Sequence, residues 1–215
     1  MNTKNNIRHL CITTIGFLIH IYFIRLLNKL AFYVSEGPEL IILYIMIQWT
    51  IPCIIILLLK KEGKHIADLG FSNNHYLRQI INGCLLALIL VIAIYIIPDF
   101  ISGKPIIYPE IHFSIMNVLY YILGVSAAEE ILVRGYLYTK LYEIKESYCF
   151  AAIVSSLIFG FYHIYGGNIH QMINATICGI ILCVFRLKVK NCTLLSLILA
   201  HGIYGTLGIQ IFTAF

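Results

Sequence analysis

Apolar runs of about twenty residues, separated by short charged stretches, make up almost the whole chain. A helix rises about 1.5 Å per residue, and the hydrocarbon core of a bilayer is about 30 Å thick, so runs of this length predict helices that cross a membrane. The composition agrees, because 60% of the 215 residues are hydrophobic and 12% are charged, whereas a soluble domain is about half apolar and about a quarter charged. We expect an all-α, polytopic membrane helical bundle with about seven transmembrane helices.

The candidate segments divide into two groups within one membrane domain. Residues 1–112 hold about three N-terminal helices and residues 113–215 hold a core of about four, by the length that a span requires. Pro98 should end the third helix, because proline lacks an N–H and its ring disturbs the preceding turn. The segments are Ile7 to Val34, Glu39 to Leu59, Ile80 to Ile97, Phe113 to Tyr142, and three that begin near Cys149, Asn168 and Cys192.

The distribution of lysine and arginine predicts the topology. With a cytoplasmic N-terminus and seven alternating spans, eleven basic residues fall inside and three, Arg25, Lys29 and Lys104, fall outside. Because cytoplasmic loops carry the basic excess, we expect a multi-pass protein of the cell membrane with an external C-terminus. This placement accounts for the net charge of +5 without a nucleic-acid partner, since no basic stripe interleaved with aromatic residues occurs in the sequence.

The seven cysteines do not point to a disulfide framework or a thiolate zinc site. Their number is odd, none forms a CxxC pair, and most lie inside apolar runs. We interpret them as small hydrophobic residues.

Two glutamates and an arginine lie in the otherwise apolar fourth segment, as Glu129-Glu130-x-x-x-Arg134. A charged side chain at the centre of a bilayer costs about 2.5–3.5 kcal/mol, so such residues are rarely there without a role. Residues four apart share a helix face, which predicts that Glu130 pairs with Arg134. Glu129 lies about 100° around the helix and is left for another role. The alternative is that all three residues lie at the membrane surface.

His163 and His201 are the other polar residues within apolar runs. Taken alone, His163 resembles an interfacial histidine in an aromatic belt, and His201 fits a hydrogen bond between helices equally well. Both histidines are predicted to lie at a depth in the membrane similar to that of Glu129. Glu129 and His163 lie about 20 Å from the predicted cytoplasmic helix ends, and His201 lies about 14 Å from its own. We therefore expect the three side chains to meet in one intramembrane pocket. A carboxylate and two imidazoles can activate water, bind a carbonyl oxygen and protonate a leaving amine.

Three motifs in the C-terminal half, from about Phe113 to Phe215, are similar to those of one family. They match EExxxR at Glu129-Glu130-x-x-x-Arg134, FxxxH at Phe159-x-x-x-His163, and the start of HxxxN or HxxxD at His201. In this combination the chain resembles the CPBP (Abi, or type II CAAX prenyl protease) family of intramembrane proteases.

The resemblance implies endopeptidase chemistry on a membrane-associated peptide or protein. The substrate is a prenylated CAAX protein in the eukaryotic branch, while bacterial members are linked to bacteriocin self-immunity or peptide processing. The resemblance also implies that Glu129 is the general base, that His163 assists it, and that His201 binds the carbonyl oxygen or the water. Two mechanisms stay open, a metal-free one and a zinc held by Glu129, His163 and His201. We expect no cofactor, because the sequence has no compact HExxH.

The chain departs from the family at Gly205, four residues after His201, where asparagine or aspartate is usual. We expect Gly205 to face the pocket with room for an asparagine, and Tyr162 or Asn174 to supply the missing donor. A second HxxxN, from His170 to Asn174, begins at the head of the sixth segment and is not expected to replace the third motif. The departure favours an alternative function, a non-catalytic membrane immunity or scaffold protein of the same fold. A transporter would need more polar residues in the first three helices.

Overall fold

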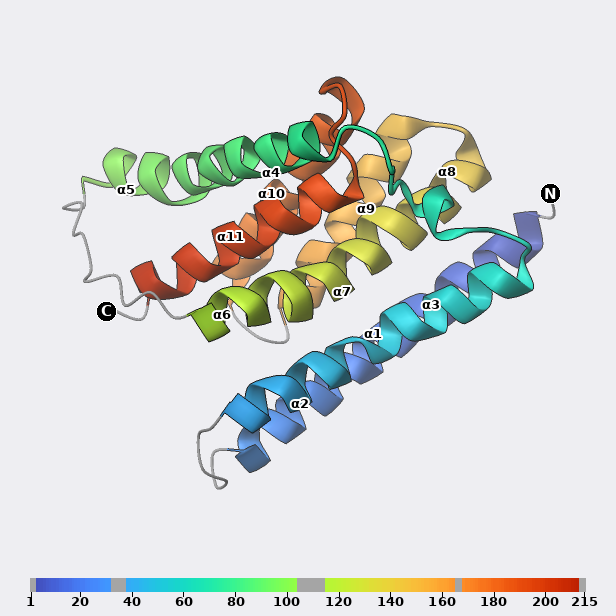
Figure 1. Ribbon diagram of the computed structural model, residues 1–215, viewed down its shortest axis with the longest axis horizontal. Coiled ribbons are helices and arrows are strands. Elements are labelled where there is room, and N and C mark those ends of the chain that lie inside the picture. The colour runs from blue at the N-terminus through green and yellow to red at the C-terminus, as the bar shows by residue number, and fades with distance from the viewer. Residues whose placement is uncertain (1–2, 32–37, 104–114, 165–167, 213–215) are drawn as a thin grey trace.

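The computed structural model describes residues 3–31, 38–103, 115–164 and 168–212 as a bundle of helices. The described part contains no strand, which confirms the all-α fold class. Figure 1 shows α1 lying against α2 and α3 as one long hairpin, beside the remaining helices. The elements are α1 (Thr3–Ala31), α2 (Pro38–Gln48), α3 (Thr50–Lys61), η1 (Ile66–Leu69), α4 (Tyr76–Val91), η2 (Ile92–Ile96), α5 (Ile97–Ile101), α6 (Ile115–Leu119), η3 (Tyr120–Ser126), α7 (Ala127–Glu130), η4 (Ile131–Leu137), α8 (Tyr138–Lys145), α9 (Tyr148–His163), α10 (Ile169–Lys188) and α11 (Leu194–Phe212).

Each of the seven predicted segments is helical. Four continuous helices are long and apolar enough to cross a membrane, namely Glu39–Lys61, Tyr76–Ile101, Ile115–Lys145 and Ile169–Lys188. Three shorter apolar helices, Leu10–His20, Tyr148–His163 and Leu194–Gly208, complete the set. The chain is therefore a helical membrane protein. Val34, Lys104, Phe113 and the predicted boundary between residues 112 and 113 lie outside the described residues.

The prediction that Pro98 ends the third helix is wrong. The helix runs on through Pro98 to Ile101, and the five residues Ile92–Ile96 before it form a π-helical segment, η2. A wide π turn relieves the clash between the proline ring and the carbonyl of the preceding turn, and re-satisfies the backbone groups that proline frees. Sequence periodicity does not reveal such a local adjustment.

The helix that carries the glutamates is also irregular. Its α-helical turn Ala127–Glu130 lies between two π-helical segments, Tyr120–Ser126 and Ile131–Leu137. Isolated π segments are uncommon and occur mostly at functional sites, because the extra residue re-aims the side chains around it. Every residue from 126 to 138 is buried, so this helix is the centre of the bundle.

Small residues let α9 and α10 pack closely behind this central helix. A Cβ on Gly160 of α9 would lie 1.8 Å from the hydroxyl of Thr176 on α10, so no larger residue fits there. A Cβ on Gly179 of α10 would lie 2.9 Å from Ser156 on α9. Close approach through small residues is the usual way in which helices associate in a membrane.

A cluster of four charges holds the end of α3 to the end of α8. Lys64 pairs with Glu143 and lies 3.4 Å from Glu62, while Lys140 contacts both carboxylates. Burial by itself would lower the pKa of Lys64, but its hydrogen bond to Glu143 and the negative charges of Glu143 and Glu62 raise it above its ordinary value. The lysine therefore stays charged, and the cluster fixes the N-terminal hairpin to the central helix.

Candidate active site

Glu130 and Arg134 form the predicted ion pair at the centre of the bundle. Arg134 Nη1 donates to Glu130 Oε1 over 2.8 Å, and both side chains are fully buried. The guanidinium carbon lies 4.2 Å from the centre of the Phe159 ring, so the phenylalanine of FxxxH covers the arginine of EExxxR. A Cβ on Gly179 would lie 2.6 Å from Arg134 Nη2, so a glycine is needed where the guanidinium sits. Glu129, Glu130 and Arg134 are thus all buried inside the protein.

His201 lies between the two glutamates. Its Nδ1 is 2.8 Å from Glu130 Oε1, and its Nε2 is 3.8 Å from Glu129 Oε2. A carboxylate paired with an arginine only accepts hydrogen bonds, so Nδ1 of His201 is the donor to Glu130. In the neutral ring Nε2 is then an acceptor directed at Glu129, and in the protonated ring it is a donor. Glu130 therefore fixes both the orientation and the tautomer of the histidine.

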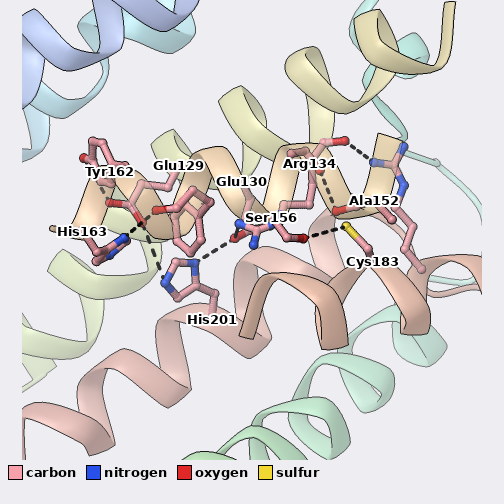
Figure 2. A network of polar contacts seen from close by, with 12 residues as sticks. Glu129, Glu130, Arg134, Ala152, Ser156, Tyr162, His163, Cys183 and His201 are labelled. Atoms are coloured by element: carbon pink, nitrogen blue, oxygen red, sulfur yellow. Dashed lines mark hydrogen bonds and ion pairs between the residues drawn. The ribbon is translucent and has the colours of Figure 1, made fainter. Parts of the chain in front are cut away.

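Glu129 keeps one carboxylate oxygen available. Tyr162 donates its hydroxyl to Glu129 Oε1 over 3.4 Å, and Figure 2 shows Tyr162, Glu129 and His163 grouped on the same side of His201. Within the described part of the chain, Glu129 Oε2 has no hydrogen-bond partner although it is buried. A buried carboxylate oxygen without a partner is costly unless a ligand or water meets it, so this oxygen is the natural place for one.

His163 is held by its own helix. Its Nδ1 lies 2.9 Å from the carbonyl oxygen of Phe159, and because a carbonyl only accepts, Nδ1 is the donor. Phe159 also contacts the edge of the His163 ring, with centroids 4.7 Å apart, and that of His201, at 5.8 Å. Phe159 thus fixes the position of both histidines and of Arg134.

Glu129, His163 and His201 line one cavity of about 510 Å³, as the sequence predicts. Asn174 and Gly205, two further residues from the sequence analysis, line it as well. A larger hollow, of about 630 Å³, lies over the end of α3 and the segment that follows it; within the described residues it contains no motif residue and has no part in this site. The convergence of the three side chains is observed, while their catalytic roles stay a prediction.

Several residues around this cavity were not predicted from the sequence. His170, from the HxxxN that was set aside, lines the cavity beside Asn174, and Tyr95 reaches it from the N-terminal half. Phe17 of α1 stacks on Tyr162 with ring centroids 4.0 Å apart and planes 3° from parallel. Neither aromatic residue carries a sequence signal, because an aromatic residue in an apolar helix resembles any lipid-facing or core residue.

The expected room at Gly205 is largely taken by Tyr121. Gly205 does face the cavity, but a Cβ there would lie 3.0 Å from Tyr121 Cδ1. An asparagine at this position would therefore displace the Tyr121 ring by a few tenths of an ångström or more. The expectation of free space at Gly205 is wrong, because the Tyr121 side chain on η3 fills the space beside it.

The described residues do not form a group of three or more His, Cys, Asp or Glu side chains with the geometry of a metal site. Nδ1 of both histidines donates, to Phe159 and to Glu130, so Nε2 is the ring atom of each that could face a ligand. A structural zinc site needs four ligands and a catalytic one three with an open position. The described geometry does not support a zinc held by Glu129, His163 and His201.

Comparison with known families gives one match. Residues 111–207, the part that carries all three motifs, match the family described as type II CAAX prenyl endopeptidase, Rce1-like. Comparison with curated proteins and with solved structures gives no match. The matched family is a protease family, and the first three helices lie outside the matched residues. Over residues 111–207 the chain is thus similar to the Rce1-like type II CAAX prenyl endopeptidases, which confirms its resemblance to the CPBP family.

Proposed function

We propose that this protein is an intramembrane endopeptidase that cleaves membrane-associated polypeptides with a water molecule activated by Glu129. The observation that carries the proposal is the buried carboxylate oxygen Oε2 of Glu129, which has no hydrogen-bond partner among the described residues and lines a cavity together with two oriented histidines. A protease-family match over the same residues supports the same class of reaction.

The reaction needs three groups in this cavity. Glu129 takes a proton from water, and the oxygen of that water attacks the carbonyl carbon of the scissile bond. Protonated His201 donates from Nε2 to the carbonyl oxygen as negative charge develops there, while Glu130 stabilises the charged ring through Nδ1. The tetrahedral intermediate then breaks its C–N bond, and the proton held by Glu129 passes to the leaving nitrogen. The products are a carboxylic acid and an amine.

His163 and the neighbouring polar residues have supporting roles in this proposal. His163 keeps Nε2 directed away from its own helix carbonyl and is placed to orient the water or the leaving amine. Tyr162 holds the other oxygen of Glu129. Asn174 lines the cavity and is the side-chain amide that we assign to the oxyanion in place of the residue missing at Gly205.

The test is cleavage of a panel of apolar membrane peptides by the purified full-length protein in lipid vesicles. Glu129→Gln keeps the shape of the side chain but removes the base, so we expect cleavage to fall about a hundred- to ten-thousandfold. Glu146→Gln is the matched control, because Glu146 is exposed in the connection after α8, and it should cleave at the wild-type rate. Activity should also survive a strong zinc chelator. Loss of activity on chelation, restored by zinc, would replace the metal-free mechanism.

The alternative, a non-catalytic immunity or scaffold protein, is favoured by the departure at Gly205. It makes the opposite prediction for a cellular phenotype. A phenotype that survives the combined loss of Glu129, His163 and His201 would end the protease proposal, whereas a scaffold needs none of these groups.

A further inference from the structure

Glu129 lies near the middle of the central helix, and the other residues that line the catalytic cavity come from one end of the bundle. α9 contributes only its last turns, through Phe159 and His163, and α10 contributes its first half, from Asn168 to Cys178. α11 lines the cavity from His201 onward. Within the described residues, the turns beside the α8–α9 and α10–α11 connections contribute nothing. The cavity therefore extends from the buried glutamates toward the end of the bundle where α9 meets α10.

Among the described residues, α9 is much shorter than the central helix beside it. α9 has 16 residues, whereas the central helix Ile115–Lys145 has 31. At a rise of about 1.5 Å per residue these are about 24 Å and about 46 Å. Starting from the shared α8–α9 connection, α9 ends near the level of Glu129, while the central helix continues for another fourteen residues to Ile115. The exposed side chains of Asn168, His170 and Gln171 form the mouth of the cavity.

The basic residues gather at the opposite end of the bundle. Lys64 contacts Glu143, and the N–H of Leu194 donates to the carbonyl of Gly70 over 3.0 Å, so the α3–α4 connection, the end of α8 and the α10–α11 connection lie together. Figure 1 shows this side, with the N-terminus and α8, facing away from α5, α6 and the C-terminus. Eleven of the fifteen lysine and arginine residues belong to these segments and to the N-terminus. The positive-inside rule makes this the cytoplasmic end.

The lining of the cavity indicates the chemistry of its substrate. Its described residues include four aromatic side chains and the amides of Asn168, Gln171 and Asn174, but no lysine or arginine. Glu129 is the one carboxylate among them. A free C-terminal carboxylate would meet no lysine or arginine here and would be repelled by Glu129. An internal segment of uncharged, apolar residues would instead find aromatic surface for its side chains and amide groups for its backbone.

We propose that the site opens to the outer side of the membrane and that its substrate is an uncharged, apolar segment of an exported polypeptide, presented at the outer leaflet. This inference rests on the proposed function and narrows its substrate class. A cytosolic prenylated protein would approach the opposite, basic end, where the described turns do not line the cavity. The peptide lies in the recess above α9, with its scissile carbonyl at Glu129, His201 and Asn174, and its flanking backbone against Gln171.

The side on which the cavity opens is measured without any activity. Two single cysteines on α10, Gln171→Cys at the mouth and Lys188→Cys at the other end, are both at exposed positions. They are introduced after alanine has replaced the four cysteines that are exposed in the described part of the chain. In intact cells, a membrane-impermeant maleimide should label the Gln171→Cys variant at least about tenfold faster than the Lys188→Cys variant. Permeabilised cells should label both. Labelling of only the Lys188→Cys variant in intact cells would overturn the inference.

The substrate class is measured with two single-span reporters that carry the same apolar cleavable segment. One places the segment at the outer leaflet and the other at the inner leaflet. We expect cleavage of the outer reporter alone, and its loss in the Glu129→Gln variant. Cleavage of the inner reporter alone would overturn the inference and leave the proposed protease intact. Cleavage of neither, nor of any peptide in the wider panel, would count against the proposed function, while the labelling result would still decide the side of the opening.

Discussion

Glu130→Ala should destabilise the folded protein far more than Glu129→Gln, although the two glutamates are adjacent. Glu130 Oε1 accepts from Arg134 over 2.8 Å and from His201 over 2.8 Å, and all of these atoms are buried. Removal of Glu130 leaves a guanidinium without its counter-charge in a low-dielectric interior. Glu129 lies at the cavity wall, and its substitution by glutamine disturbs two long contacts, at 3.4 Å with Tyr162 and at 3.8 Å with His201.

The free energies of unfolding of the two variants should differ by several kilocalories per mole. Breaking a buried ion pair by removing one partner costs about 3–5 kcal/mol. Since about 1.4 kcal/mol is a factor of ten, the unfolding constant should rise about a hundred- to several thousandfold for Glu130→Ala. A single hydrogen bond contributes about 0.5–1.5 kcal/mol, and the contacts of Glu129 are long, so Glu129→Gln should cost about 1 kcal/mol or less.

The assay is reversible unfolding in mixed micelles, followed by the fluorescence of Trp49. This is the one tryptophan of the chain, and its Nε1 donates to the carbonyl of Leu123 on the central helix over 2.6 Å. The control replaces Glu130 and Arg134 together by methionine, which should be less destabilising than Glu130→Ala because no uncompensated charge stays buried. A Glu130→Ala variant as stable as the wild type, or a Glu129→Gln variant destabilised as strongly, would contradict the role of the buried ion pair.

Two further predictions concern residues that contact the catalytic groups from neighbouring helices. Phe17→Ala removes the ring stacked on Tyr162, a contact worth about 0.5–1.5 kcal/mol, and should lower turnover about two- to twelvefold. Phe23→Ala, at an exposed position of the same helix, should leave turnover unchanged. Equal rates for the two variants would contradict a role of Phe17 in positioning Tyr162. Gly205→Asn alone should not raise turnover, because the new Cβ would lie 3.0 Å from the Tyr121 ring. Gly205→Asn combined with Tyr121→Ala should raise turnover. A gain from Gly205→Asn alone would show that the Tyr121 ring moves aside without cost.

The sequence determined the fold class and most of the motif geometry. Apolar run length fixes how many helices form, because only a helix satisfies its own backbone groups in lipid. Spacing of four along one helix placed Arg134 beside Glu130, as observed. Depth counted from the helix ends put Glu129 and His163 at about 20 Å and His201 at about 14 Å, near enough to meet, and the structure has them on one cavity. These are properties of single helices, which sequence periodicity describes well.

The tertiary structure decided how the helices face one another. That His201 bonds to Glu130 through Nδ1, that Tyr121 occupies the space beside Gly205, and that Phe17 stacks on Tyr162 all depend on how neighbouring helices are rotated about their axes. The π-helical segments before Pro98 and on both sides of Glu130 change that rotation by an extra residue per turn. In a uniformly apolar sequence every face of a helix is equally suited to burial, so the contacts between helices are selected by packing and by a few polar bonds, which only the folded arrangement contains.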